Sequence, residues 1–323
     1  MPIPVSVVMP VLNEEPYLEG ACAAVLDNGY EGPIELVMAL GPSTDGTDAV
    51  AERLAADSRV VLVANPAGAT PAALNRAIAA ASHDVVIRAD GHARLPRGYI
   101  ADAVAALAST GAANVGGRMV PGSDAPLGKA IAVAMASPWG IGGAGHRVGG
   151  AAGPADSVYL GAFRRTALDA VGGYDEHFRR AQDWELNYRL RHAGLGVYFV
   201  PTMRVPYEPR RTWRALARQF HESGRWRREV ARVHPDSRSL RYFAAPIVAV
   251  AVGAGLALAA LGAITGLAVL AAAAILPVGY VAGILIASLT HLRDLPLRSL
   301  LLLPGVFATM HMAWGIGYLR GIA

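Results

Sequence analysis

Short β-rich apolar runs alternate with longer stretches of helical periodicity over the first 120 residues of the chain. The strand-like runs are residues 5–9, 34–38, 60–63 and 85–87, and the helical stretches are residues 15–26, 47–56 and 71–81. Strands that alternate with helices of this length imply right-handed crossovers and a mainly parallel sheet in an α/β fold. Ligands of such sheets bind beyond the carboxyl ends of the strands. The turns that follow these runs are therefore the first places to look for a site.

The pattern changes in the second half of the polar region. Residues 137–156 are rich in glycine and poor in large apolar side chains, which predicts a long functional loop. Beyond the loop we expect a strand at residues 158–160 and a helix at residues 182–192. The basic segment at residues 209–242 predicts an amphipathic interfacial helix, because apolar residues recur in it at helical spacing. This stripe comprises Trp213, Leu216, Ala217 and Phe220, and it shifts phase after Gly224.

Charged residues are absent between Phe243 and Thr290. A bilayer core needs about 20 apolar residues per helix, so the sequence predicts about three membrane spans. They are expected near residues 243–261, 267–289 and 300–319. The alternative is a buried helical hairpin in a soluble protein.

Arginines set the expected orientation of these spans. A cluster of them precedes the first span, and Arg293 and Arg298 follow the second. The positive-inside tendency puts both sets on the cytoplasmic side of the membrane. Arg320 would then lie outside, unless the third segment is interfacial or re-entrant.

Composition limits the cell compartment in which the protein is expected and the kinds of metal or disulfide site that it can contain. Lys129 is the only lysine among 29 basic residues, which is typical of an arginine-rich bacterial proteome. The single cysteine, Cys22, excludes an internal disulfide and a zinc site built from several cysteines. The chain runs into its first strand without a charged region and an apolar signal core. We expect the polar domain to stay in the cytoplasm, attached to the bacterial inner membrane.

The strongest candidate chemistry follows the fourth strand, at Asp90-Gly91-His92. A carboxylate and an imidazole two residues apart in a turn can both reach one divalent ion. Such an ion can neutralise a diphosphate leaving group and act as a Lewis acid. The alternative is an ordinary turn aspartate beside a solvated histidine.

Two further motifs end the first and second strands. One is Pro10-Val11-Leu12-Asn13-Glu14, and the other is Ser43-Thr44-Asp45-Gly46-Thr47. Each alone is more often a helix cap, but their order and spacing relative to Asp90 are specific. On these motifs the polar part of the chain resembles the family 2 glycosyltransferases. The resemblance implies a GT-A nucleotide-sugar-binding domain with a membrane-anchored tail.

The resemblance also implies a donor pocket, with one departure from the family pattern. The family's second strand usually ends in two carboxylates and a glycine, which Leu40, Gly41 and Pro42 replace here. One of those acids normally contacts the base or the ribose, so the nucleotide is left open. The donor-binding residues expected from the resemblance are Pro10, Leu12, Asn13, Glu14, Gly41, Asp45, Asn75, Arg88 and Asp90.

The family's Asp-x-Asp metal motif corresponds in position to Asp90-Gly91-His92. Its second acid is a histidine here, and imidazole is a softer ligand than a carboxylate. We therefore expect Asp90 and His92 to bind a divalent metal, with Mn²⁺ preferred over Mg²⁺.

A catalytic base is expected near residue 183. In the family it lies in a Glu-Asp pair downstream of a Gly-Gly-Phe/Tyr-Asp-Glu phrase, which matches residues 172–176. Gln182 replaces the glutamate, and Asp183 occupies the base position. One base without a covalent nucleophile implies a single displacement and inversion at the anomeric carbon. The alternatives are that Asp183 only caps a helix, and that Glu185 is the base or holds an arginine.

Within the family, the chain is most similar to the succinoglycan-biosynthesis (ExoA-type) transferases. The shared features include Arg-x-Asp-x-His at residue 88 and the phrase that begins at Gln182. The resemblance implies a polyprenyl-diphosphate-linked saccharide as acceptor. The residues expected to bind the acceptor or membrane lipids are Gln182, Trp184, Arg218, Gln219, Arg225 and Trp226. The arginines among them could instead simply orient the membrane hairpin.

The sequence therefore predicts an inverting, metal-dependent glycosyltransferase with a nucleotide-sugar donor, which acts in cell-envelope or exopolysaccharide biosynthesis. The expected parts are a catalytic domain at residues 1–208, an interfacial region at 209–242 and a membrane domain at 243–323. No nucleic-acid partner is expected. The alternatives are a polyprenyl-phosphate sugar synthase and, outside the enzymes, a membrane scaffold of a polysaccharide-assembly complex. A transporter is disfavoured because the first two spans contain no ionisable residue.

Overall fold

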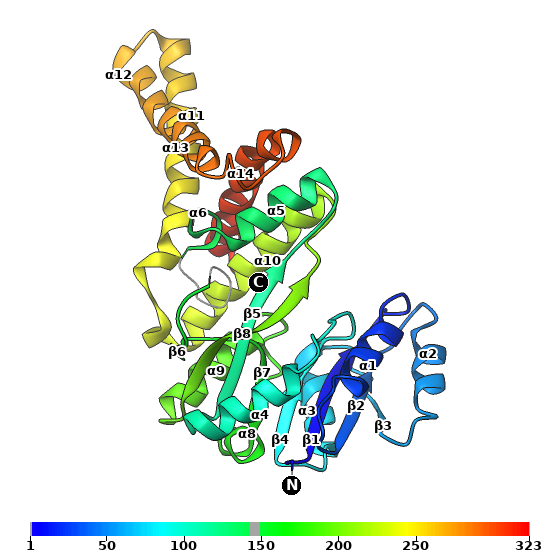
Figure 1. The fold of residues 1–323 in the computed structure, drawn as a ribbon. Coiled ribbons are helices and arrows are strands. Elements are labelled where there is room, and N and C mark those ends of the chain that lie inside the picture. The colour runs from blue at the N-terminus through cyan, green and yellow to red at the C-terminus, as the bar shows by residue number, and fades with distance from the viewer. Residues whose placement is uncertain (1, 143–148, 323) are drawn as a thin grey trace. The chain divides into compact units, whose positions relative to one another are not determined.

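The structure is a computed structural model that describes residues 2–142 and 149–322. The chain divides into two compact units (Figure 1). The first comprises residues 1–120 and 145–207, and the second comprises residues 121–144 and 208–323. The second unit resumes at residue 208. Residues 121–144 were expected in the catalytic domain, but they group with the helices of the second unit.

An eight-stranded sheet forms the centre of the first unit, in the order β3-β2-β1-β4-β7-β5-β8-β6. The first four strands along the chain are parallel neighbours, and β7 pairs antiparallel with both β4 and β5. The sheet is therefore mainly parallel on the side that contains β1, as the sequence predicted. The strands are β1 Val5–Val11, β2 Ile34–Leu40, β3 Val60–Ala64, β4 Val85–Arg88, β5 Asn114–Pro121, β6 Gly153–Pro154, β7 Tyr159–Arg164 and β8 Val197–Tyr207.

Helices cover both faces of this sheet because alternate strand residues point to opposite sides. Val7 packs with helices α1 and α4 in one apolar cluster, whereas Val8 packs with α3, α8 and α9 in another. Val86 belongs to the second cluster, so Arg88, two residues later, is directed to the face that α9 covers. The helices of this unit are α1 Leu18–Leu26, α2 Thr47–Leu54, α3 Thr70–Ala80, α4 Tyr99–Thr110, α8 Arg165–Val171 and α9 Gln182–His192.

The second unit is helical among the residues that the structure describes. Its helix α10 is continuous from Trp213 to Val233, and α11 and α13 pair as a hairpin through α12. Helix α14 packs on α5, α10 and α11. The helices are α5 Pro126–Ala136, α6 Pro138–Ile141, α10 Trp213–Val233, α11 Ala244–Thr265, α12 Ala268–Ala271, α13 Ile275–Leu289 and α14 Leu297–Arg320.

In the part of the chain that the structure describes, three helical segments are long and apolar enough to cross a membrane: 240–265, 268–289 and 297–320. They correspond to the three segments expected from the sequence. Their surroundings differ, because 39% of the most apolar window of the last segment is buried against protein, compared with 11% and none for the other two. Of the three segments, the third is therefore the most covered by other helices of its unit.

Close backbone approach explains the phase shift in the apolar stripe of α10. A side chain at Gly224 would collide with the Trp314 carbonyl of α14, and one at Gly317 would collide with the His221 carbonyl. The two glycines let α10 and α14 touch along their backbones. The apolar stripe of α10 shifts at Gly224 while the helix continues, because Gly224 contacts α14 through its backbone and needs no apolar side chain there.

The glycine-rich segment at 137–156 contains more structure than a loop prediction suggests. Residues Pro138–Ile141 form α6, which Ser137 caps by accepting a hydrogen bond from the Trp139 backbone N–H at 3.3 Å. Strand β6 follows at Gly153–Pro154 and pairs with β8. The predicted loop residues 143–148 lie outside the described residues.

Candidate active site

The candidate site lies in the first unit, where β1, β2 and β4 end at the carboxyl edge of the sheet. Strand β1 leads into the Asn13-Glu14 turn, β2 leads into the loop at residues 41–46, and β4 leads into Asp90-Gly91-His92. The sequence predicted this arrangement because the carboxyl ends of parallel neighbours meet at one edge. Helix α9 adds Asp183 at its first turn.

Arg88 joins the two carboxylates that the sequence assigned to different roles. Its side chain is only 7% exposed, and its Nε and Nη2 atoms lie 3.0 and 2.9 Å from Asp90 Oδ1. Its Nη1 atom donates a hydrogen bond to Asp183 Oδ1. The guanidinium therefore fixes the position of Asp183 relative to Asp90 across 95 residues of sequence.

Asp183 combines an accessible carboxylate with a desolvated setting. Its side chain is 41% exposed, compared with 19% for Asp90. Desolvation raises the pKa of Asp183 above the ordinary value of 3.8, the positive charge of Arg88 opposes that rise, and the negative charge of Asp90 adds to it. A carboxylate with a raised pKa that still reaches solvent is suited to accept a proton from a hydroxyl group.

Tyr174 is a site residue that sequence reasoning did not assign. Its side chain is buried, and burial raises the pKa of its hydroxyl group, with a further contribution from the charge of Asp183. The Tyr174 backbone is held by Asn75, whose Oδ1 accepts from Tyr174 N at 2.8 Å and whose Nδ2 donates to Tyr174 O at 2.8 Å. Asn75, expected to bind the donor, therefore anchors the Gly-Gly-Tyr turn. The phrase at residues 172–176 was the sequence signal for this role.

Glu185 lies on the buried side of α9 and pairs with Arg189. Its side chain is 1% exposed, and its two oxygens accept hydrogen bonds from Arg189 at 2.7 and 2.8 Å. Arg189 also donates to the carbonyl of Gly173 at 2.8 Å. Of the two alternatives for Glu185, these contacts favour the one in which it holds an arginine.

The Asp90-Gly91-His92 turn packs directly on Glu14. His92 Nδ1 lies 2.8 Å from Glu14 Oε1, and a side chain at Gly91 would come within 2.9 Å of Glu14 Cγ. A carboxylate at one imidazole nitrogen is the arrangement that orients metal-binding histidines. The glycine is required for this close approach.

These residues fit a divalent cation that is shared with a diphosphate. No group of three or more His, Cys, Asp and Glu side chains within residues 2–142 and 149–322 could hold a metal without other ligands. Asp90 and His92 offer one carboxylate and one imidazole, and hard cations often take the rest of their ligands from substrate phosphates and water. The donor set therefore suits a metal that binds together with the nucleotide.

Hydrogen bonds fasten the first two motifs to each other. Asn13 has a φ of 56°, which aims its side chain across the turn, and its Oδ1 accepts from the Thr44 backbone N–H at 2.8 Å. Glu14 N donates to Thr47 Oγ1 at 2.8 Å. Asp45 accepts from Thr47 N at 3.1 Å, and these contacts with Thr47 lower the pKa of Asp45. Asn13 and Asp45, expected to bind the donor, thus shape the loops beside the predicted donor pocket.

Apolar groups occupy the place of the family's missing acid. Leu12 is 38% exposed, and a side chain at Gly41 would lie 3.0 Å from its terminal methyl group. Pro42 lies beside Gly68, whose φ is +64°. Pro10 belongs to β1, where it pairs in register with Ala39. The surface next to the predicted donor pocket is therefore apolar where the family usually presents a carboxylate.

The residues expected to bind the acceptor fall in both units. Gln182 and Trp184 lie in the first turn of α9 in the first unit, and Trp184 stacks on Tyr188 with ring centroids 5.6 Å apart. The remaining four residues lie on α10 in the second unit and are Arg218, Gln219, Arg225 and Trp226.

Gln219 and Arg225 of α10 are held by contacts within their own unit. Gln219 Oε1 accepts a hydrogen bond from Arg210 Nε at 3.2 Å. Arg225 donates to the Gly321 carbonyl at 2.7 Å and lies 3.2 Å from Glu222. Arg225 therefore caps the C-terminal end of α14. For this residue, the contact favours the alternative in which the arginines organise the membrane segment.

Comparison with known proteins assigns the chain to a family. The profile of the family described as "Glycosyl transferase family 2" matches residues 6–172, just over half of the chain. Among curated proteins, "Succinoglycan biosynthesis protein ExoA" of Rhizobium meliloti (strain 1021) is 36% identical over 256 residues, which cover 78% of each protein.

A solved structure has the same fold. The mannosyltransferase PcManGT from Pyrobaculum calidifontis, in complex with GDP-Man and Mn²⁺, aligns over 99% of this chain and 87% of its own with a TM-score of 0.61. At 19% identity, this similarity concerns the fold alone. The profile match over half of the chain and the identity to the curated relative establish that the chain belongs to glycosyl transferase family 2.

Proposed function

We propose that this glycosyltransferase moves a sugar, with inversion, from a nucleotide donor to a polyprenyl-diphosphate-linked saccharide. The observation that carries the proposal is the Asp90–Arg88–Asp183 arrangement, in which one accessible carboxylate is held at a fixed position beside the predicted diphosphate site. The relative named as a succinoglycan biosynthesis protein supports a role in exopolysaccharide biosynthesis.

In this mechanism Asp183 removes the proton from the acceptor hydroxyl as that oxygen attacks the anomeric carbon. Arg88 holds the carboxylate and keeps it ionised, because its positive charge opposes the rise in the pKa of Asp183. Tyr174 closes the buried side of the site. One base and one displacement invert the anomeric configuration.

On the donor side, the joined loops at residues 12–14 and 43–47 form the edge that receives the nucleotide. Asp90 and His92 would hold a divalent cation, which supplies charge neutralisation of the departing diphosphate. The Asp90 carboxylate meets Arg88 through Oδ1, so its other oxygen faces away from this pair. At the apolar surface of Leu12 and Gly41, the nucleobase would be recognised by stacking and by the shape of the pocket. A carboxylate contact to the base is not expected there.

We also propose that the hairpin of α11 and α13 crosses the bacterial inner membrane and that α14 lies along the cytoplasmic interface. Phe243, at the start of the first span, meets Tyr318, near the end of α14, with ring centroids 5.7 Å apart. Arg228 donates to the Tyr318 carbonyl at 3.2 Å. Helix α14 begins after the second span has returned to that side, so both of its ends belong to the same face. This supports the interfacial alternative for the third segment.

The test is a transfer assay with the full-length protein in nanodiscs, first screened for the nucleotide sugar that raises its thermal unfolding midpoint with Mn²⁺. Two acceptor lipids are then compared: a polyprenyl-diphosphate-linked saccharide and a bare polyprenyl phosphate. We expect transfer to the first, with the anomeric configuration opposite to that of the donor by NMR. Transfer to the bare phosphate alone would establish a polyprenyl-phosphate sugar synthase instead. Retention of configuration would overturn the mechanism.

A further inference from the structure

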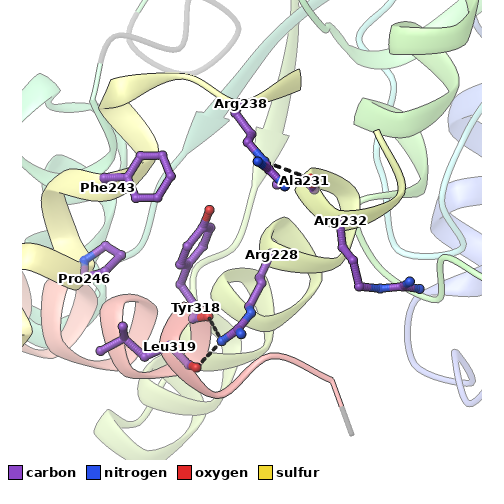
Figure 2. A pocket seen from close by; sticks show the side chains of 8 residues that line it. All are labelled: Arg228, Ala231, Arg232, Arg238, Phe243, Pro246, Tyr318 and Leu319. Carbon is purple, nitrogen blue, oxygen red and sulfur yellow. Dashed lines mark hydrogen bonds between the residues drawn. The ribbon is translucent and has the colours of Figure 1, made fainter. Parts of the chain in front are cut away.

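A cavity lined by arginines lies in the second unit, where three helical segments meet (Figure 2). Its volume is about 530 Å³. The walls come from the C-terminal half of α10, the connector before α11, the start of α11 and the last turn of α14. None of the residues assigned above to donor, metal or acceptor binding lines it.

The polar side of the cavity is cationic. Arg228, Arg232 and Arg238 line it, and no lining residue is acidic. Arg228 uses Nη1 for the last carbonyls of α14, and Arg238 uses Nε for the Ala231 carbonyl at 3.3 Å. Arg232 pairs with Glu229 at 2.5 Å, and its guanidinium group points away from the other lining side chains in Figure 2. The guanidinium groups of Arg228 and Arg238 remain on the cavity side, and such groups recognise phosphate oxygens through charge-assisted hydrogen bonds.

The opposite side of the cavity is apolar and belongs to the membrane segment. Phe243 and Pro246 stand where α11 begins, and Leu319 contributes from the end of α14. Helix α11 contains no charged residue, so an alkyl chain that leaves the cavity along this wall follows a span into the bilayer. A ligand that satisfies both sides has an anionic head and a hydrocarbon tail.

We propose that this cavity binds an anionic phospholipid of the bilayer, with its phosphate on Arg228 and Arg238 and an acyl chain along Phe243 and Pro246. The bound lipid would bridge α10, α11 and α14 and so fasten the amphipathic helix to the membrane hairpin. The inference rests on the cavity and on the apolar hairpin, and it holds whichever sugar or acceptor the enzyme uses.

The test measures lipid binding to the full-length protein in phosphatidylcholine nanodiscs with and without phosphatidylglycerol. Thermal unfolding gives the stabilisation, and native mass spectrometry of detergent-released protein counts retained phospholipids. The variant is Arg228→Gln with Arg238→Gln, and the matched control is Arg214→Gln, an exposed arginine of α10 outside the cavity. Each lining arginine near the bilayer surface contributes about fivefold in lipid affinity. We therefore expect the double variant to lose on the order of 25-fold, with the control unchanged.

Three outcomes would overturn the proposal. The first is equal phosphatidylglycerol binding by the double variant and the wild type. The second is equal stabilisation by inorganic phosphate, which would identify a phosphate site that needs no acyl chain. The third is displacement of the phospholipid by a stoichiometric amount of polyprenyl diphosphate, which would make the cavity an acceptor site. The single variant Arg238→Gln, which leaves the contacts of Arg228 with the end of α14 intact, separates loss of binding from loss of folding.

Discussion

Arg88 holds the geometry of the site because it is buried between two carboxylates on different elements. Strand alternation directs its side chain toward the face covered by α9, and its planar guanidinium can meet Asp90 and Asp183 at once. A lysine would keep the positive charge but would lose the planar set of N–H donors that reaches both carboxylates. The residue therefore sets both the position and the ionisation of the proposed base.

The pH dependence of catalysis tests this residue. Asp183 acts only when ionised, so activity is lost as the pH falls through its pKa, and a raised pKa places that loss above the ordinary value of 3.8. Removing the positive charge in Arg88→Gln removes the effect that lowers the pKa, so the acid limb of the kcat profile should move to still higher pH. Arg88→Lys is the charge-retaining control and should move it less. An acid limb that is unchanged or lower in Arg88→Gln, with folding verified by circular dichroism, would contradict this role.

Metal preference tests the histidine at residue 92. Imidazole favours Mn²⁺ over Mg²⁺, and the Glu14 carboxylate fixes the ring. We expect the wild type to be faster with Mn²⁺ and His92→Ala to lose at least the roughly 10- to 100-fold in metal affinity that removal of a ligand-orienting partner costs. His92→Asp should shift the preference toward Mg²⁺, as measured by initial rates in metal titrations. Equal rates with both metals, together with indifference to His92→Ala, would rule out a ligand role.

At the scale of elements, the two apolar helices of the hairpin differ in character from α14. Helices α11 and α13 expose large apolar side chains along most of their length, whereas α14 buries Leu303, Phe307 and Met310 against its own unit. His311, in the same helix, donates a hydrogen bond from Nε2 to the Trp139 carbonyl at 2.7 Å. These contacts are consistent with the proposed position of α14, lying on protein at the membrane surface.

Cysteine labelling tests the position of α14. In a Cys22→Ala background, a cysteine introduced by Arg320→Cys should react with a membrane-impermeant maleimide only when the cytoplasmic side is accessible. Thr265→Cys, at the end of α11, is the matched control and should react from the opposite side. Labelling of both from the periplasm would establish that α14 is a third span.

Most elements could be predicted because their apolar periodicity is local information. The run at residues 5–9 and the helix at 182–192 correspond to β1 and α9. The grouping of residues 121–144 with the second unit could not be predicted, since it depends on the packing of α5 against α14. The role of Gly224 could not be predicted for the same reason, because it contacts the backbone of α14, which is far away in the sequence.

At the scale of the whole molecule, the sequence predicted which segments meet at the candidate site but not the contacts between them. Asp90 and Asp183 were expected there from motif phrases, yet the arginine that joins them was assigned only to the donor. Asn13 and Asn75 have the polar side chains of binding residues, but they hydrogen-bond to the backbone of neighbouring loops. Hydrogen bonds between segments far apart in sequence leave no local pattern, so such roles emerge only from the fold.

The most direct test of the account is the transfer rate of Asp183→Asn in the full-length enzyme, measured beside donor binding. The substitution removes the proton acceptor while it preserves size, so kcat should fall by about 10²- to 10⁴-fold with donor affinity retained. Asp169→Asn, an exposed position on α8, should behave like the wild type. Unchanged product formation by Asp183→Asn would contradict the proposed mechanism.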